Sequence, residues 1–278
     1  MLVHSPFLPL IIDYRDGNRD LVAEDEEVIM LALKHRDRMG RIYLQLPVPS
    51  LQKLIPAIEG DFPALEILRI GPAAKHNTRL MLSPTFKAQQ LRHPILDHFT
   101  SPFGSPFLTS AVGLATLLLL WINLSMYLHP NILLQSLSLL PQLEILQLGF
   151  LSPVPNREIE SQLSHTPITT QIALPNFRLF RFQGNSAYLE AFLLQMAAPL
   201  LKTLSIYFFD QLSFSVPRLL QFMSTTKRFE FSRAQFLFYP KGVVVFLQPP
   251  AGARLTNFYV GVTCEHFDWQ ISSAASYA

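Results

Sequence analysis

FPALEILRI, residues 62–70, returns almost unchanged as LPQLEILQL, residues 140–148. Each copy places large apolar side chains three, six and eight positions after its first residue. Looser copies with the same spacing occupy residues 174–182 and 198–206, and weaker ones begin at Arg38, Ala88, Ala111 and Met223. The eight starts are separated by 24, 26, 23, 29, 34, 24 and 25 residues. Most of these spacings lie within the period of about 20 to 29 residues that is typical of leucine-rich repeats.

Within each copy the apolar positions alternate, which predicts a strand whose sixth and eighth positions after the start face a core while the seventh faces outward. Helical spacing precedes several strands. Residues 24–36 begin with acidic side chains and end with basic ones, as the helix dipole favours. Further short helices are predicted over residues 51–58, 130–139, 187–196 and 216–223.

A helix, a short break and a strand form one repeating unit, which buries its apolar face only by stacking on its neighbours. The predicted fold class is therefore α/β. We expect an irregular leucine-rich-repeat solenoid with parallel strands on the concave face and short helices on the convex face. Residues 1–22 are predicted to be an N-terminal lead-in, and residues 23–278 a solenoid of about eight irregular repeats with a truncated C-terminus.

The composition narrows the cellular setting and the partners. Hydrophobic residues make up 49% and charged residues 15%, whereas an average protein carries about a quarter charged residues. A formal charge of +2 is too small to predict a nucleic-acid partner. The one cysteine, Cys264, has no partner for an internal disulfide. With no basic segment typical of a signal peptide at the start, the sequence favours an intracellular protein, cytoplasmic or nuclear.

Residues 107–128 carry no charge over 22 positions, which is long enough to cross a bilayer. Asn123 lies within this run, and few flanking Lys or Arg residues would set its orientation. Leu114, Leu117 and Leu119 also fall in repeat register. A buried solenoid strand is therefore favoured over a membrane span, and a membrane-associated protein anchored by residues 107–128 remains the alternative.

Catalytic motifs are absent from the sequence. It contains no nucleophile elbow, phosphate-binding loop, dinucleotide-binding turn or zinc-protease helix. Cys264, Glu265 and His266 are adjacent, but a metal site needs further ligands at suitable spacing. We therefore expect no enzyme activity, no cofactor and no metal.

Positions four, five and seven after each start are expected to project from the concave face, where partners of repeat proteins bind. Three acidic residues occupy them: Glu66, Glu144 and Glu230. Seven basic residues also do: Arg69, Arg92, Arg178, Arg181, Lys202, Lys227 and Arg228. Five of the seven belong to the last three repeats, which predicts a positive C-terminal half. Two interpretations stay open: charges that keep an apolar solenoid soluble, or a strip that attracts an acidic protein partner.

The L-P-x-L-E-x-L-x-L strands, residues 153–167 (PVPNREIESQLSHTP) and residues 215–223 (SVPRLLQFM) resemble the fungal F-box-like leucine-rich-repeat proteins. In that family an N-terminal F-box docks on the adaptor of an SCF-type ubiquitin ligase, and the repeats recruit a substrate. The resemblance implies a non-catalytic protein-binding module that recruits substrates for ubiquitylation. No F-box-like segment precedes the first repeat, so we expect an adaptor contact only if an F-box is supplied upstream. The Asn that usually follows each strand, eleven positions after the start, occurs once, as Asn185.

Overall fold

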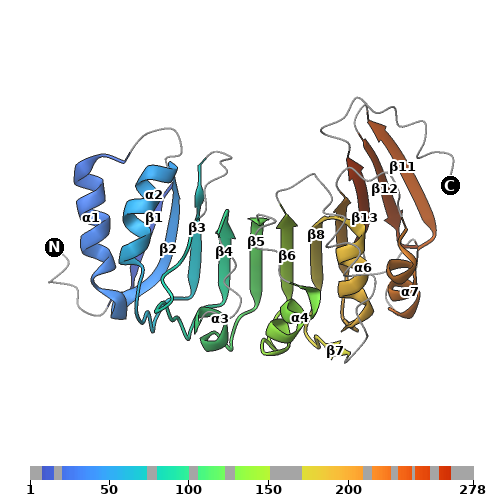
Figure 1. The fold of residues 1–278 in the computed structure, drawn as a ribbon, viewed down its shortest axis with the longest axis horizontal. Helices are drawn as coiled ribbons and strands as arrows, with labels where there is room; N and C mark the ends of the chain where they lie inside the picture. The colour runs from blue at the N-terminus through green and yellow to red at the C-terminus, as the bar shows by residue number, and fades with distance from the viewer. Residues whose placement is uncertain are drawn as a thin grey trace. The chain divides into compact units, whose positions relative to one another are not determined.

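The computed structural model describes residues 8–15, 21–73, 80–99, 106–122, 129–150, 171–208, 215–226, 231–239, 242–250 and 257–263. The chain is a mixed α/β protein with few helices and a large, mostly parallel sheet of eleven strands (Figure 1). It divides into two compact units. Unit 1 comprises residues 1–128 and 139–143, and unit 2 comprises residues 129–138 and 144–278.

In unit 1 the strands follow one another in chain order and are all parallel. The order is β1 (Leu10–Tyr14), β2 (Met39–Leu46), β3 (Ile67–Pro72), β4 (His93–Asp97) and β5 (Thr116–Ile122). Its helices are α1 (Ala23–Leu33), α2 (Val48–Leu54) and α3 (Pro106–Ser110), with short 3-10 turns at Arg36–Arg38 and Ile55–Ala57. Helix α2 packs against both β2 and β3.

Unit 2 continues with parallel strands and then ends in an antiparallel group. Its sheet order is β6 (Ile145–Phe150), β8 (Leu179–Gly184), β10 (Thr203–Phe208), β13 (Asn257–Thr263), β12 (Gly242–Gln248) and β11 (Arg233–Tyr239). The helices are α4 (Pro130–Ser138), α6 (Ser186–Leu194) and α7 (Pro217–Thr225). Two short strands, β7 (Ile172–Ala173) and β9 (Met196–Ala197), pair separately.

The sequence repeats and the strands coincide for six of the eight copies. Each of β3, β4, β5, β6, β8 and β10 begins five residues after its predicted start. In unit 2, Leu146 pairs with Phe180 and Phe180 pairs with Leu204. All three side chains are fully buried. The prediction that the sixth position after each start faces the core is confirmed for these strands.

The first copy was placed two residues too late. Ile42 pairs with Leu68, and Leu44 pairs with Ile70, so this copy begins at Arg36 instead of Arg38. The shift brings Met39, which is fully buried, to the third position. Arg41 stands three positions after the predicted start Arg38, where an apolar residue was expected, and it is exposed. A two-residue slip keeps the same side chains facing inward, and for that reason the alternation alone did not reveal it.

The copy predicted from Met223 does not form an eighth parallel strand in the described residues. Helix α7 extends to Thr225, and the next strand, β11, pairs antiparallel with β12. The strand that pairs parallel with β10 is β13. The predicted N-terminal lead-in also contains a strand, β1, which pairs parallel with β2 and buries Ile12.

The predicted helices are present, with boundaries that differ by a few residues. Helix α1 has Glu24, Asp25 and Glu26 in its first turn, and proline stands in the first turn of α2 and α7, where its missing N–H costs nothing. Helix α3 was not predicted. It and β5 contain most of the described residues of the apolar run 107–128, and residues 111–115 form the turn between them. The last residues of the run, 123–128, lie outside the description. No helix among the described residues is long and apolar enough to cross a membrane.

Candidate functional site: the open face of the sheet

One face of the strands carries the core, and the other carries side chains that are exposed or half-buried. Helices cover the core face, with α2 against β2 and β3 in unit 1 and α6 against β8 in unit 2. On the opposite side, which we call the open face, stand the residues five, seven and nine positions after each start. These side chains are held in fixed rows because parallel pairing places equivalent residues side by side.

In unit 2 the open face bears a polar and aromatic row. Gln147 pairs with Arg181, Arg181 with Ser205, and Ser205 with Tyr259. Parallel to it runs a second row, in which Gln183 and Tyr207 are flanked by glycines: Gly149, Gln183, Tyr207 and Gly261. The two rows together form a surface of amides, hydroxyls, aromatic rings and one guanidinium.

Tyr207 and Tyr259 make the aromatic centre of this surface. Their ring centroids lie 4.8 Å apart, and the Tyr259 hydroxyl donates a hydrogen bond to the Tyr207 hydroxyl. Phe246 of β12 packs edge-on against Tyr259, at 5.0 Å between centroids. Burial, aided by the Tyr207 hydroxyl, raises the pKa of Tyr259. Gly261 makes room for the pair, because a Cβ there would stand 2.9 Å from Cδ1 of Tyr207.

Arg181 is the one predicted basic residue of unit 2 that lies on a described strand of the open face, where it is exposed. Arg178 and Lys202 instead stand just before β8 and β10, at the edge of the sheet where those strands begin. Their backbones form a ladder: the Lys202 N–H donates to the Arg178 carbonyl oxygen, and the Arg178 N–H donates to that of Glu144, each over 2.8 Å.

Glu144 offsets part of this positive charge. Arg178 Nε lies 3.6 Å from Glu144 Oε2, with both side chains about half exposed (50% and 44%). An ion pair so exposed contributes little to stability. Among the described residues neither Arg181 nor Lys202 forms an ion pair. These two cations therefore keep their charge available to a partner.

The remaining four predicted basic residues lie either in unit 1 or outside the described residues. Arg69 lies on β3 and Arg92 just before β4, both in unit 1 and both exposed. Lys227 and Arg228 lie outside the described residues, as does the acidic Glu230. The seven predicted residues are thus divided between the two units and the undescribed part of the chain.

The open face of unit 1 holds a carboxylate that the sequence analysis missed. Asp97 ends β4, and burial raises the pKa of its carboxyl from 3.8 to about 6, although Arg69 and the His98 N–H act in the opposite direction. Its Oδ1 atom is buried and has no hydrogen-bond partner among the described residues. His98 Nε2 stands 3.7 Å away from it, beyond hydrogen-bond distance. Gly71 of β3 leaves room for this side chain, because a Cβ at that position would lie 2.5 Å from the Cβ of Asp97.

His98 and Trp121 occupy equivalent positions in successive repeats, ten residues after each start. Both have a positive φ (58° and 56°), which is uncommon for residues other than glycine. Their rings stack at 6.0 Å between centroids, with 16° between planes. In four other copies the tenth position holds Pro72, Phe150, Gly184 and Phe208, so no shared residue type marked this pair in the sequence.

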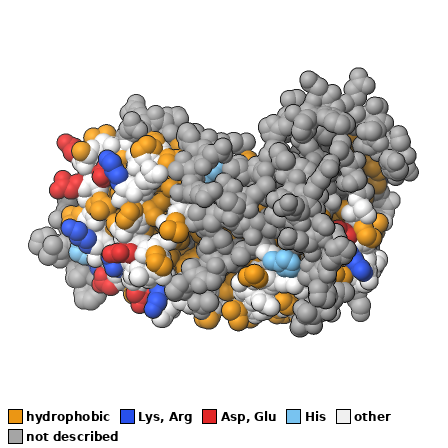
Figure 2. Space-filling view, viewed as in Figure 1, with side chains coloured by type: hydrophobic (Ala, Val, Ile, Leu, Met, Phe, Trp, Pro, Cys, Tyr) orange, Lys and Arg blue, Asp and Glu red, His pale blue; other side chains and the backbone are white. Residues whose placement is uncertain are grey.

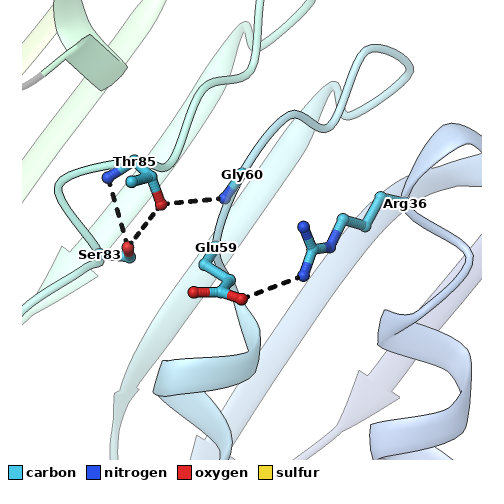
Figure 3. Close-up of polar contacts among 5 residues, drawn as sticks. All are labelled: Arg36, Glu59, Gly60, Ser83 and Thr85. Carbon is cyan, nitrogen blue, oxygen red and sulfur yellow. Dashed lines mark hydrogen bonds and ion pairs between the residues drawn. The ribbon is translucent and has the colours of Figure 1, made fainter.

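On the helix-covered side of unit 1 the described side chains carry charges of both signs. Figure 2 shows acidic and basic side chains interspersed around α1 and α2, and two ion pairs, Lys53–Glu26 at 3.1 Å and Arg36–Glu59 at 3.5 Å, join them. The loops that contain Gly60 and Thr85 are joined by hydrogen bonds. The Gly60 N–H donates to the Thr85 hydroxyl, which also shares a hydrogen bond with the Ser83 hydroxyl (Figure 3). These contacts fasten neighbouring repeats together.

The described part of the chain contains no group of three or more His, Cys, Asp or Glu side chains placed to hold a metal ion. The adjacent Cys264, Glu265 and His266 lie outside it. Comparison with models of known protein families, with curated proteins and with solved structures gave no significant match.

Proposed function

We propose that this chain is a non-catalytic, leucine-rich-repeat-type solenoid that binds an acidic protein partner on the open face of unit 2. The observation that carries the proposal is the pair of rows on this face, in which the exposed Arg181 of β8 stands one strand from Tyr207 and two strands from Tyr259. Two features support the solenoid: parallel strands recur in the same register, and a short helix precedes most of them.

The residue types on this surface suit protein recognition. Tyrosine and arginine are enriched among the residues that dominate binding energy at interfaces. Two tyrosines joined by a hydrogen bond present a large, pre-ordered contact area. Arg181 and Lys202 add positive charge that no described carboxylate neutralises, which favours an acidic partner and accelerates its association.

The resemblance to F-box-like repeat proteins leads to a narrower proposal for the same surface. Its partner is a substrate that the repeats recruit to an SCF-type ubiquitin ligase inside the cell, where an F-box supplied upstream docks on the adaptor. Capture of an acidic partner does not depend on this narrower proposal, so the two can be tested apart.

The test is charge reversal on unit 2 with a matched reversal on unit 1. Arg181→Glu combined with Lys202→Glu should abolish capture of the partner in a proximity-labelling experiment in cells. Arg69→Glu combined with Arg92→Glu changes the net charge equally, on exposed sites of the other unit, and should leave the captured proteins unchanged. Circular dichroism and the thermal unfolding midpoint establish that each double variant folds.

Salt provides a second readout, because attraction between exposed charges weakens as the ionic strength rises. Association of a captured partner should slow markedly between low and physiological salt for the wild type. Capture of the same set of proteins by the unit 2 variant would show that Arg181 and Lys202 only solvate the surface.

A further inference from the structure

Strand β11 ends the sheet of unit 2 and is unusually exposed for an apolar strand. It spans Arg233–Tyr239 and pairs with β12 along one edge, and no described strand pairs with its other edge (Figure 1). Phe236 is 53%, Phe238 69% and Tyr239 52% exposed. Isolated exposed apolar residues are normal on protein surfaces, but three large ones on a single seven-residue edge strand are not.

The exposed phenylalanines extend the core side of the sheet. Phe236 pairs with Val245, Val245 with Val260, and Val260 with the buried Ile206 of β10. Because paired residues share a face, Phe236 and Phe238 stand on the face that helices cover elsewhere in the sheet. At β11 this apolar face reaches the edge of the sheet and stays exposed.

The backbone of β11 is open as well. In an antiparallel strand, alternate residues direct their N–H and C=O groups to opposite neighbours. The outer edge of β11 therefore presents donors and acceptors that no described strand pairs with. Proteins usually protect such an edge with lysine, proline or a bulge. From Arg233 to Tyr239 the strand contains one charged residue, at its end, and its pairing with β12 is regular.

We propose that a second copy of this chain adds to this edge, with the two β11 strands pairing antiparallel about Phe236. Such pairing sets Phe236 opposite Phe236, the small Ala234 opposite the large Phe238, and Gln235 opposite Leu237. At each end Arg233 meets Tyr239, where a guanidinium lies over an aromatic ring. The same kind of contact holds Arg15 over Tyr43 in unit 1, at 4.6 Å.

This self-complementarity identifies the occupant as a second copy. The two-fold pairing leaves no like charges opposite each other, matches side-chain sizes and continues the apolar face across both copies. Seven paired residues form a small contact, whereas a stable complex buries roughly 1,200 to 2,000 Å². We therefore expect a weak dimer that forms only at high protein concentration. The inference rests on β11 and is independent of the proposed acidic partner.

The experiment uses the two-fold axis, because a charge at Phe236 meets its own copy. The full-length chain is followed by sedimentation velocity over a range of concentrations. The wild type should pass from the mass of one chain to twice that mass. Phe236→Lys and Phe236→Glu alone should each weaken association by about tenfold or more, since like charges then stand opposite each other.

Mixing the two variants is the decisive arm: Lys then faces Glu, and a mixed dimer should reappear. Leu220→Lys, on the 63% exposed Leu220 of α7, is the control and should dimerise as the wild type does. A mixture that stays monomeric would overturn the two-fold pairing. A wild type that is monomeric at every concentration would also overturn it. So would a wild type that forms assemblies larger than a dimer if the Ile11→Lys variant does not form them, because the contact would then lie at the β1 edge.

Amide hydrogen exchange tests the proposal without substitutions, independently of whether the variants fold. Protection of the β11 amides in the wild type should rise with protein concentration, while that of β3 and β5 stays constant. Equal protection of β11 at all concentrations would contradict pairing at this edge.

Discussion

Gly71 and Asp97 face each other across β3 and β4, and their contact explains why a glycine interrupts the apolar end of β3. A Cβ at Gly71 would lie 2.5 Å from the Cβ of Asp97, which is closer than two carbons approach without displacement. Neither atom is the end of a flexible side chain, so relief requires movement of the backbone. The position therefore selects glycine for lack of space.

We predict that Gly71→Ala lowers the free energy of unfolding by about 1 to 3 kcal/mol, as overpacking does. Chemical denaturation would measure the loss. Removing the opposing Cβ with Asp97→Gly in the same chain should restore part of the stability, because the two substitutions share one contact. Additive losses in the double variant would show that the space at Gly71 is not what matters.

Asp97 also makes a pH-dependent contribution to stability. Burial raises the pKa of its carboxyl to about 6, so the folded chain binds a proton that the unfolded chain has released between about pH 4 and pH 6. Stability from this group is therefore present below about pH 4 and is lost as the pH rises through 6. The unpartnered Oδ1 atom is consistent with a group that is more stable when protonated.

Asp97→Asn should remove this loss, and at pH 7.5 the variant should be more stable than the wild type by about 1 to 3 kcal/mol. The difference between the two should shrink toward zero near pH 4. Unfolding curves at half-unit pH steps measure it, and titrating groups that do not interact with Asp97 cancel in the difference. A constant difference across the range would assign the effect to packing instead of to the charge.

At the scale of elements, the repeating strands were predictable because alternation and repeat spacing act together. Six strands begin five residues after their predicted starts. In five of them the residue six positions after the start is an inward leucine or phenylalanine, and in β4 it is Pro94. Where that signal fails, the prediction failed too. The first copy was placed at Arg38, although the pairing of Ile42 with Leu68 sets its start at Arg36. The strand after Met223 was expected to be parallel, although the chain there turns into an antiparallel group.

Two elements left too little periodic signal. Strand β1 has five residues, of which only Ile12 is buried. The strand therefore forms because it pairs with β2, and its own sequence carries little alternation. Helix α3 is a single turn of PFLTS inside an apolar run, where helix and strand cannot be told apart by periodicity.

The register of β6 predicts opposite outcomes at adjacent residues. Leu146 is fully buried, and Leu146→Ala should lower the free energy of unfolding by about 2 to 5 kcal/mol. Gln147 faces the open side and is half-buried, so Gln147→Ala should change it by no more than about 0.5 kcal/mol. Equal losses measured by denaturant titration would contradict the register.

Asn185 is the single residue between β8 and α6, and it caps the start of the helix. Its Oδ1 accepts a hydrogen bond from the Tyr188 N–H at 2.8 Å, which satisfies one of the free donors at a helix start. Asn185→Ala should cost about 1 kcal/mol, whereas Asn185→Asp should preserve most of the stability. A loss in the aspartate variant as large as in the alanine variant would show that the cap is not the cause.

At the scale of the whole molecule, the candidate site was predictable only in part. Arg181 belongs to the open face because it stands an odd number of positions from an inward residue. The tyrosine pair was not predictable, since Tyr259 reaches Tyr207 only through a strand that returns after an antiparallel group. Asp97 and Trp121 escaped notice because their environments depend on strands from neighbouring repeats.

A destabilising substitution should act mainly on nearby strands, because each repeating strand pairs with the strands beside it. Leu68 lies between Ile42 of β2 and Pro94 of β4. Leu68→Ala should therefore lower amide-exchange protection most in β2, β3 and β4, by the amount that about 2 to 5 kcal/mol of lost stability implies. Strands β8 and β10 should lose less.

Leu204→Ala is the matched variant, since Leu204 is equally buried and lies between Phe180 and Phe258 in unit 2. Its losses should centre on β8, β10 and β13 and spare β2 to β4. Two variants with mirrored patterns mean that each unit opens by itself. The same uniform loss in both would mean that the chain unfolds as one cooperative body, in which a repeat is stabilised by the whole sheet and not mainly by its neighbours.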